Sequence, residues 1–379
     1  MFQERKSQHI LRHNLNLMRI FGIEIRQNST NVQTQLWRIL NVILAIASIT
    51  FYGHCWWYNP RHLPTYCAVS MTIMAVVYYR VTTKNGRKIL NLLDDMMLIL
   101  SKDQLSMIEK YSLRRVIGFW TSAIVLIVNS FIISFVIKST EFSKLIVTYP
   151  LPIGYVGLAI NEIAFITINY IGCHMLVNCV FYVNVQNVLE QHAISIGKLA
   201  KTTKSSYGQQ RAQMIQLITN LYLYHIKVKQ FVNSTLGVVP LMTFVTTFVL
   251  YMSGISHVIM FGSQFSTLFL ITCIVSFAIF YTSINYYLVC NASRATNELE
   301  ACYSKITVIV SHSNSSDSQM VKEERDALYR TITCIGIEPA SAYGLFNIDP
   351  TLVLSFPNMM VPFLVMIITT IDSMSRQSS

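Results

Sequence analysis

Charged residues are scarce in this sequence: Asp, Glu, Lys and Arg make up 12% of its 379 residues, whereas hydrophobic residues make up 53%. Soluble proteins carry roughly 25% charged residues, and a single soluble core cannot hide this much apolar surface. The scarcity of charge therefore excludes an ordinary soluble protein and favours one that lies in lipid. The opening segment MFQERKSQHILRHNLNLMRI has no apolar run followed by a small-residue cleavage site. We therefore expect the first hydrophobic helix to act as an uncleaved insertion signal.

Enzyme and metal signatures are also missing. The sequence has no GxSxG, HExxH, P-loop or dinucleotide-binding motif. Its eight cysteines and nine histidines form no CxxC pair and no cluster with metal spacing. We therefore expect no enzyme activity, no metal and no cofactor. Cys55 and Cys67 flank a short turn that we place outside the cell, so a disulfide between them is geometrically conceivable but not favoured.

Long apolar runs dominate what is present. A membrane helix needs about 20 largely apolar residues, and seven segments qualify. These segments are 36–58, 63–82, 116–137, 150–187, 236–258, 263–290 and 350–371. The fourth segment is unusually long, and its only charge is Glu162, so we expect it to continue past the bilayer as one helix. The sequence predicts an all-α membrane protein, with residues 1–379 forming a single seven-helix domain without a recognisable internal repeat.

The distribution of Lys and Arg predicts the orientation of these helices. With a cytosolic N-terminus, the inside segments are 1–38, 80–115, 187–235 and 291–335. They hold 6, 8, 6 and 5 Lys/Arg, which is 25 of the 29. An excess of this kind marks the cytosolic side. The sequence therefore predicts a multi-pass plasma-membrane protein with an extracellular C-terminus. The net charge of +11 follows from this topology, so nucleic acid is not an expected partner, whereas membrane lipid is.

The cytosolic segments have helical patterns of their own. Residues 84–115 are predicted to extend the second and third helices, and residues 319–335 are predicted to form an amphipathic helix. Ser316 and Gln319 fit a capping box at its start. The apolar positions on one face of this helix are Val321, Leu328, Ile332 and Ile335. Because it has too many charges to cross a membrane, we expect it to pack against cytosolic helices of the same chain or of a second subunit.

Glu162 is the most informative single residue. It lies about eleven residues into the fourth segment, which places it near the middle of the membrane. A carboxyl group there is costly unless it faces a cavity or a partner. It is therefore either part of a ligand or ion site, or an interhelical hydrogen-bonding group. Other polar and aromatic candidates for an outward-facing pocket are Asn161, Tyr66, Ser70, Asn129, Tyr251, Gln264 and Thr267. Such a pocket would suit a small organic ligand, although an aromatic belt at the membrane interface also explains some of the tyrosines.

The seventh segment is polar at its end. Thr369 and Thr370 precede Asp372, and a row of hydroxyl groups on a last helix is able to line a water-filled path. Threonine also bonds back to its own helix, which is the structural alternative.

The region leading into this segment resembles the signature of insect gustatory receptors. In that family a Gly-apolar-Phe-x-apolar-Asp run precedes the last helix, and here Gly344, Phe346 and Asp349 match it, together with Leu345 and Ile348. The family then has Thr-Tyr, five apolar residues and Gln-Phe. In residues 362–370 the aromatic residue and the five apolar residues are retained, whereas the threonine, the glutamine and the final phenylalanine are not.

The resemblance implies a ligand-gated, non-selective cation channel that assembles as a homo- or hetero-tetramer. The seventh helices would surround a central pore, the cytosolic helices would join the subunits, and each subunit would bind a small-molecule tastant. Thr369 stands where the family has its pore glutamine. The neighbouring pore or gate candidates are Phe363, Met366 and Thr370.

Three alternatives remain. Insect odorant receptors share this architecture. A metabotropic seven-helix receptor fits the helix count, but the charge bias opposes an outer N-terminus, and Asp-Arg-Tyr and Asn-Pro-x-x-Tyr motifs are missing at the expected places. A secondary transporter that uses Glu162 is the third alternative.

Overall fold

A computed structural model describes residues 6–23, 63–148, 151–204, 208–261, 267–311 and 317–352, together with single positions at 25 and 206, between 32 and 50 and between 358 and 369. The helices with defined bounds are α1 (Lys6–Ile10), α2 (Arg12–Ile20), α4 (Leu63–Met97), α5 (Lys102–Thr148), α6 (Leu151–Thr203), α7 (Gly208–Leu236), α8 (Val238–Phe261), α9 (Thr267–Ser311) and α10 (Gln319–Ile335). Within these ranges, extended pairing is limited to one bridge between Ser341 and Asn347. The all-α expectation is therefore confirmed.

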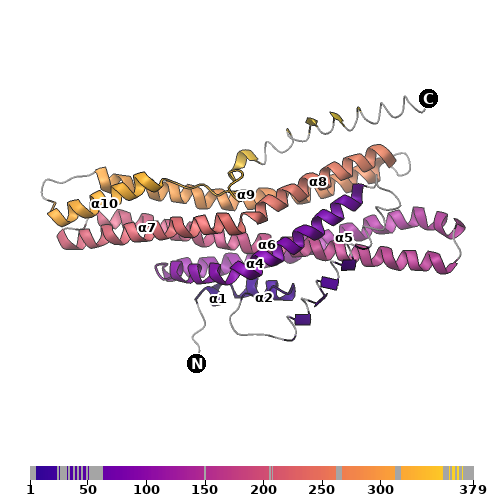
Figure 1. Ribbon diagram of the computed structural model, residues 1–379, viewed down its shortest axis with the longest axis horizontal. Helices are drawn as coiled ribbons and strands as arrows, with labels where there is room; N and C mark the ends of the chain where they lie inside the picture. Colours follow the sequence, from indigo (N-terminus) through magenta and orange to yellow (C-terminus); the bar gives the residue numbers. More distant parts are fainter. Residues whose placement is uncertain are drawn as a thin grey trace.

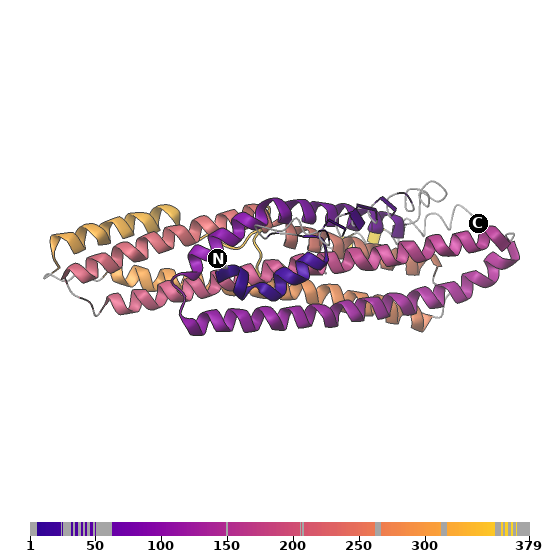
Figure 2. The same cartoon turned by 90° about the horizontal axis from the view of Figure 1, so that it is seen from below.

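The long helices run roughly along one common axis (Figures 1 and 2). α6 has 53 residues, which at about 1.5 Å per residue makes it about 80 Å long. The expectation that the fourth segment continues as one helix is confirmed, since α6 extends unbroken from Leu151 to Thr203. It is also the central element, because α4, α5, α7, α8 and α9 all pack against it.

Two apolar clusters hold the bundle together. The larger cluster joins α1, α2, α4, α5, α6, α8, α9 and the end of α7, and its bulkiest fully buried members include Phe181 and Tyr182. The second cluster joins the far ends of α6 and α9 to α7 and α10 through residues such as Ile215, Leu299 and Leu328. The helices outside the expected spans therefore form a packed unit of their own rather than loose loops.

α10 begins and ends where the amphipathic pattern predicts. Val321, Leu328 and Ile332 are buried, whereas Ile335 remains 39% exposed. The expected capping box is wrong in its register. The N-cap is Ser318, whose Oγ accepts a hydrogen bond from the Val321 amide at 3.4 Å, so the helix begins two residues later than a box headed by Ser316 requires.

The short helices α1 and α2 are an addition that the sequence analysis did not foresee. They pack beside α4, α5 and α6 (Figure 1). Leu11 and Met18 are fully buried there, and the Ser7 amide donates to Asp94 Oδ1 at 2.7 Å. The sequence pattern that indicates these helices is the spacing of Leu11, Leu15 and Met18 along one helical face. It was overlooked because the segment is polar overall.

Two stretches of the described chain are long and apolar enough to cross a membrane: Lys102–Val128 and Gly208–Val249. In the first, Ile117, Ile124 and Val128 are each more than half exposed. Apolar side chains that point outward along a whole helix are what lipid contact requires. The number of spans and the sidedness of the termini stay predictions.

Candidate functional site

The family-like motif forms a tight hairpin between α10 and the helical residues that begin at Pro350. The Ala342 amide donates to the Phe346 carbonyl at 2.9 Å, and the Ile348 amide donates to the Ala340 carbonyl at 2.8 Å. Tyr343 and Gly344 have φ values of 58° and 75°. Positive φ at both central residues is typical of a type I′ turn, which explains why glycine stands at the second of them. We call residues 340–348 the linker hairpin.

The other two motif residues fix the hairpin and its exit. The ring of Phe346 meets the ring of Phe244 on α8 edge to face, with centroids 6.1 Å apart. Asp349 Oδ1 accepts hydrogen bonds from the amides of Thr351 at 2.8 Å and Leu352 at 3.2 Å. Asp349 is thus the N-cap of the next helical turn, with Pro350 at the first helical position.

Side chains of α7 and α9 hold the linker hairpin in place. Asn233 Nδ2 donates to the Pro339 carbonyl at 3.0 Å, and Asn233 Oδ1 accepts from the Ser341 amide at 3.3 Å. Thr296 Oγ1 accepts from the Ala340 amide at 3.2 Å. These bonds tie the connection between α10 and the last segment to α7 and α9.

Gly237, the turn residue between α7 and α8, lies directly against the hairpin backbone. A Cβ at this position would be 2.5 Å from the Tyr343 amide nitrogen and 2.9 Å from the Ser341 carbonyl oxygen. Real side chains do not tolerate such contacts with backbone. The α7–α8 junction and the linker hairpin therefore meet without a side chain between them, so that movement of one displaces the other.

A buried basic cluster lies between α6 and α7. His192 Nδ1 and His225 Nδ1 are 3.1 Å apart, with the rings stacked at 5.3 Å between centroids. Both residues are fully buried, and neither Nε2 has a hydrogen-bond partner among the described residues. Because one Nδ1 must donate and the other must accept, the pair holds a single proton between the two facing nitrogens when both rings are neutral.

Burial controls the titration of this cluster. It lowers the pKa of His192 to about 4. The pKa of His225 is lowered well below 6.5, first by burial and then by the charges of His192 and Lys229. Lys229 is 1% exposed, and its Nζ donates to Thr296 Oγ1 at 3.2 Å. Burial lowers the pKa of Lys229 to about 8, against the opposing effects of Glu338 and Glu300. The sequence analysis missed this cluster because it treated each histidine separately.

Arg115, just before the expected span 116–137, joins the three helices α5, α6 and α9. Its Nη1 donates to Asn184 Oδ1 on α6 at 2.9 Å, and its Nη2 donates to Asn291 Oδ1 on α9 at 3.0 Å. Its Nε donates to the Tyr287 hydroxyl at 3.0 Å. This guanidinium therefore acts as a structural clamp, besides contributing to the charge bias that predicts the topology.

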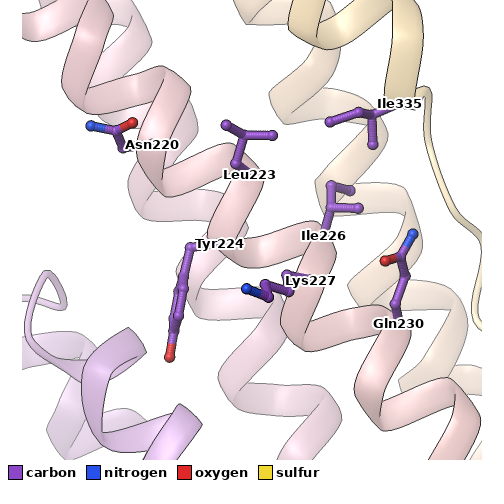
Figure 3. A pocket seen from close by; sticks show the side chains of 7 residues that line it. All are labelled: Asn220, Leu223, Tyr224, Ile226, Lys227, Gln230 and Ile335. Carbon is purple, nitrogen blue, oxygen red and sulfur yellow. The ribbon is translucent and has the colours of Figure 1, made fainter.

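A groove of about 500 Å³ lies along α7 beside the end of α10 (Figure 3). Its lining comes from α7 except for Ile335, and consists of Asn220, Leu223, Tyr224, Ile226, Lys227, Gln230 and Ile335. The Tyr224 hydroxyl closes one side by bonding to the Leu92 carbonyl at 3.1 Å. This groove lies on α7 and α10, outside the expected spans, and so differs from the outward-facing pocket predicted from the sequence.

Of the predicted ligand-binding residues, Tyr251 on α8 has a described side chain. Its hydroxyl is 2.6 Å from Thr282 Oγ1 on α9, and one turn earlier in α8 Thr247 Oγ1 accepts from Asn285 Nδ2 at 2.6 Å. These bonds fasten α8 to α9. The remaining candidates have side chains outside the described residues: Glu162 and Asn161 on α6, Tyr66, Ser70 and Cys67 on α4, Asn129 on α5 and Thr267 on α9. Gln264 and Cys55 lie wholly outside them.

The pore candidates are described in part. Met366 is 57% exposed. Thr369 Oγ1 donates to the carbonyls of Val365 and Met366, each at 2.9 Å. The hydroxyl is thus satisfied within its own helix, as the structural alternative requires. Phe363 and Thr370 lie outside the described residues.

Comparison with known proteins identifies the fold. No family model matches the sequence, and no curated protein matches it either. The structure is similar to that of the insect olfactory receptor OR5 from Machilis hrabei, with a TM-score of 0.64 and 14% sequence identity. The match covers 95% of this chain and 97% of the receptor. The same receptor in complex with eugenol matches with a TM-score of 0.64 and 14% identity over 96% and 98% of the two chains.

The chain therefore has the fold of an insect olfactory receptor over almost its whole length. This confirms the resemblance to the insect chemoreceptor group at the level of fold, and it does not separate gustatory from odorant receptors.

Proposed function

We propose that this protein is a chemosensory receptor subunit that forms a ligand-gated, non-selective cation channel in the plasma membrane. The single observation that carries the proposal is the fold shared with a solved insect olfactory receptor from end to end. The motif Gly344, Phe346 and Asp349 adds support, because these three residues build the connection into the last helix rather than lying at random on the surface.

The proposed mechanism places ligand binding and gating in different parts of the chain. A small organic ligand binds in the outer half of the bundle near Glu162. It opens the channel only by binding the open arrangement more tightly than the closed one. The last segment, with Phe363, Met366, Thr369 and Thr370, lines the pore. The linker hairpin couples ligand binding to the pore, because it is bonded to Asn233 on α7 and leads directly into the last segment.

Assembly with further subunits explains the exposed apolar residues on the cytosolic helices. Tyr329 and Met320 on α10 are 53% and 46% exposed, and Leu217 on α7 is 46% exposed. Apolar side chains that lie in water on paired helices favour a contact with another chain. The groove beside Ile335 lies on the same helices. A tetramer of identical or related subunits, as the resemblance implies, would cover these residues.

The choice between taste and smell rests on two opposing observations. The sequence motif resembles that of gustatory receptors, which favours a tastant and contact chemosensation. Two solved structures that match are of the same insect olfactory receptor, one of them in complex with eugenol. We favour a gustatory subunit and keep an odorant receptor subunit as the alternative.

The test is current recording from cells that express the full chain, alone and with related subunits, against matched panels of tastants and volatile odorants that include eugenol. Saturable, ligand-evoked cation currents are expected. Substrate uptake without current would instead favour a transporter, and current that depends on G proteins would favour a metabotropic receptor.

Mutation of Glu162 to Gln tests the proposed ligand site. It is expected to shift the concentration that evokes half-maximal current, with surface expression unchanged. Loss of surface expression without any shift would assign Glu162 to helix packing.

A further inference from the structure

One face of α4 carries four exposed basic residues at the end of the expected span 63–82 and just beyond it. Arg80, Lys84, Arg87 and Lys88 are all exposed. At 100° per residue they lie within about 100° of the helix circumference, so they form one stripe rather than a ring. We call these four residues the basic face.

The same side of α4 is apolar one turn earlier. Ile73 and Val76 are 52% and 50% exposed, and their helical positions place them in line with the basic face. The opposite side is packed, since Thr82, Ile89 and Leu93 are at most 1% exposed. A single outward face therefore changes from exposed aliphatic to exposed cationic along the axis. This is the order in which a helix meets acyl chains and then headgroups.

The charges of the basic face are available to a ligand. In the described part of the chain, the ion pairs join Arg211 and Arg325 to Asp317, and none involves Arg80, Lys84 or Arg87. Lys88 sits with its Nζ 4.4 Å above the Phe231 ring of α7. That contact fixes one edge of the face without neutralising its charge.

The length of the basic face indicates which anion fits. Arg80 lies about 6 Å along the axis from Val76, and Lys88 lies about 12 Å beyond Arg80. The headgroup layer of one leaflet is only about 5–8 Å thick. A lipid with a single phosphate reaches Arg80 but not the far end, whereas an inositol ring with several phosphates extends from the membrane into the cytosol. Guanidinium groups bind phosphate oxygens in pairs, which suits Arg80 and Arg87.

We propose that the basic face of α4 binds the headgroup of a polyphosphorylated inositol lipid in the cytosolic leaflet. The proposal rests on the proposed function as a membrane receptor and on the orientation predicted from the Lys/Arg distribution, which puts this end of α4 in the cytosol. Clusters of four to eight basic residues directly cytoplasmic to a membrane helix attract such lipids. Here the apolar residues above the face would pack against the acyl chains of the same lipid molecule.

The experiment measures binding of a fluorescent short-chain phosphatidylinositol bisphosphate to the full-length receptor in neutral detergent, by fluorescence anisotropy. The triple variant Arg80→Gln, Lys84→Gln, Arg87→Gln is expected to bind at least about tenfold more weakly than the unmodified receptor, given the attraction of each basic residue near a membrane surface. Phosphatidylserine, with one phosphate, is expected to compete poorly. Free inositol trisphosphate is expected to bind more weakly than the lipid, because it lacks the acyl chains.

A matched control removes three exposed lysines from the far cytosolic end of α6. Lys198, Lys201 and Lys204 are all exposed, and they lie eleven or more residues beyond the expected span 150–187. Their replacement by Gln removes the same charge and is expected to change lipid affinity less than about twofold. If both variants lose lipid affinity equally, net charge alone explains the binding, and the proposal is overturned.

Other outcomes would also overturn it. Equal affinity for free inositol trisphosphate would point to a soluble ligand rather than a lipid. A basic-face variant that loses its oligomeric state in light scattering would show that a neighbouring subunit covers the face. Failure of this proposal is distinguishable from failure of the proposed function, because ligand-evoked current is recorded separately from lipid binding.

Discussion

Acidification is expected to destabilise the packing of α6 against α7 through the buried pair His192 and His225. Unfolded imidazole titrates near pH 6.5, whereas burial lowers the pKa of His192 to about 4. Between these values the unfolded chain binds more protons than the folded chain. The stability that the neutral histidine pair contributes is therefore complete above about pH 6.5 and is lost as the pH falls toward 4.

The magnitude follows from the size of the pKa shift. For His192 alone, the loss is about 1 kcal/mol at pH 5.5 and about 3 kcal/mol at pH 4. The lowered pKa of His225 adds a further loss of the same sign. Lys229, one turn further along α7, adds positive charge that opposes protonation of His225. The carboxylates of Glu338 and Glu300 act on Lys229. The histidine pair therefore has no nearby anion of its own that would favour its charged form among the described residues.

The assay is thermal unfolding of the purified receptor in neutral detergent at pH 7.5 and pH 5.5. We expect the double variant His192→Phe, His225→Phe to lose less stability on acidification than the unmodified protein, by at least about 1 kcal/mol. A control variant His9→Phe removes an exposed imidazole on α1 and should leave the acid-dependent loss in place. If the double variant and the unmodified protein lose stability equally, the buried pair is not the source and the reasoning is refuted.

Three further predictions concern the linker hairpin and the cytosolic helices. Gly237→Ala introduces a Cβ 2.2 Å from the Asn233 carbonyl oxygen of α7 and 2.5 Å from the Tyr343 amide nitrogen of the hairpin. It is expected to cost about 1–3 kcal/mol of stability and to reduce ligand-evoked current; unchanged melting would show that the end of α7 and the hairpin both move aside without cost. Asp349→Ala removes the N-cap and is expected to cost about 1 kcal/mol, whereas Asp349→Asn should retain most of it; a comparable loss in both variants would argue against capping. Leu328 is fully buried, so Leu328→Ala is expected to lower the free energy of unfolding by about 2–5 kcal/mol. Tyr329 lies on the exposed side of α10, so Tyr329→Ala should weaken subunit assembly and leave the monomer fold intact. Light scattering and thermal unfolding separate these two effects, and the reverse pattern would exclude the proposed subunit contact.

Much of the architecture was predictable because membrane helices have a simple sequence pattern. Long apolar runs, and the continuation of the fourth run with a single charge at Glu162, are enough to predict one uninterrupted helix. The bounds of α10 followed from the spacing of Val321, Leu328 and Ile332. The cap register failed because Ser316 and Ser318 are both good N-cap residues, and the sequence alone does not decide between them.

The sequence by itself determined the helical class, the long central helix and the position of the motif before the last segment. All of these depend on local composition and period. The tertiary structure decided what the motif does. Gly344, Phe346 and Asp349 are a turn, an aromatic anchor and a helix cap only once α7, α8 and α9 surround them. The same holds for His192 and His225, which are thirty-three residues apart and become one titrating unit because α6 and α7 pack side by side. Contacts between distant residues depend on how helices pack, and a single sequence carries no direct record of that packing.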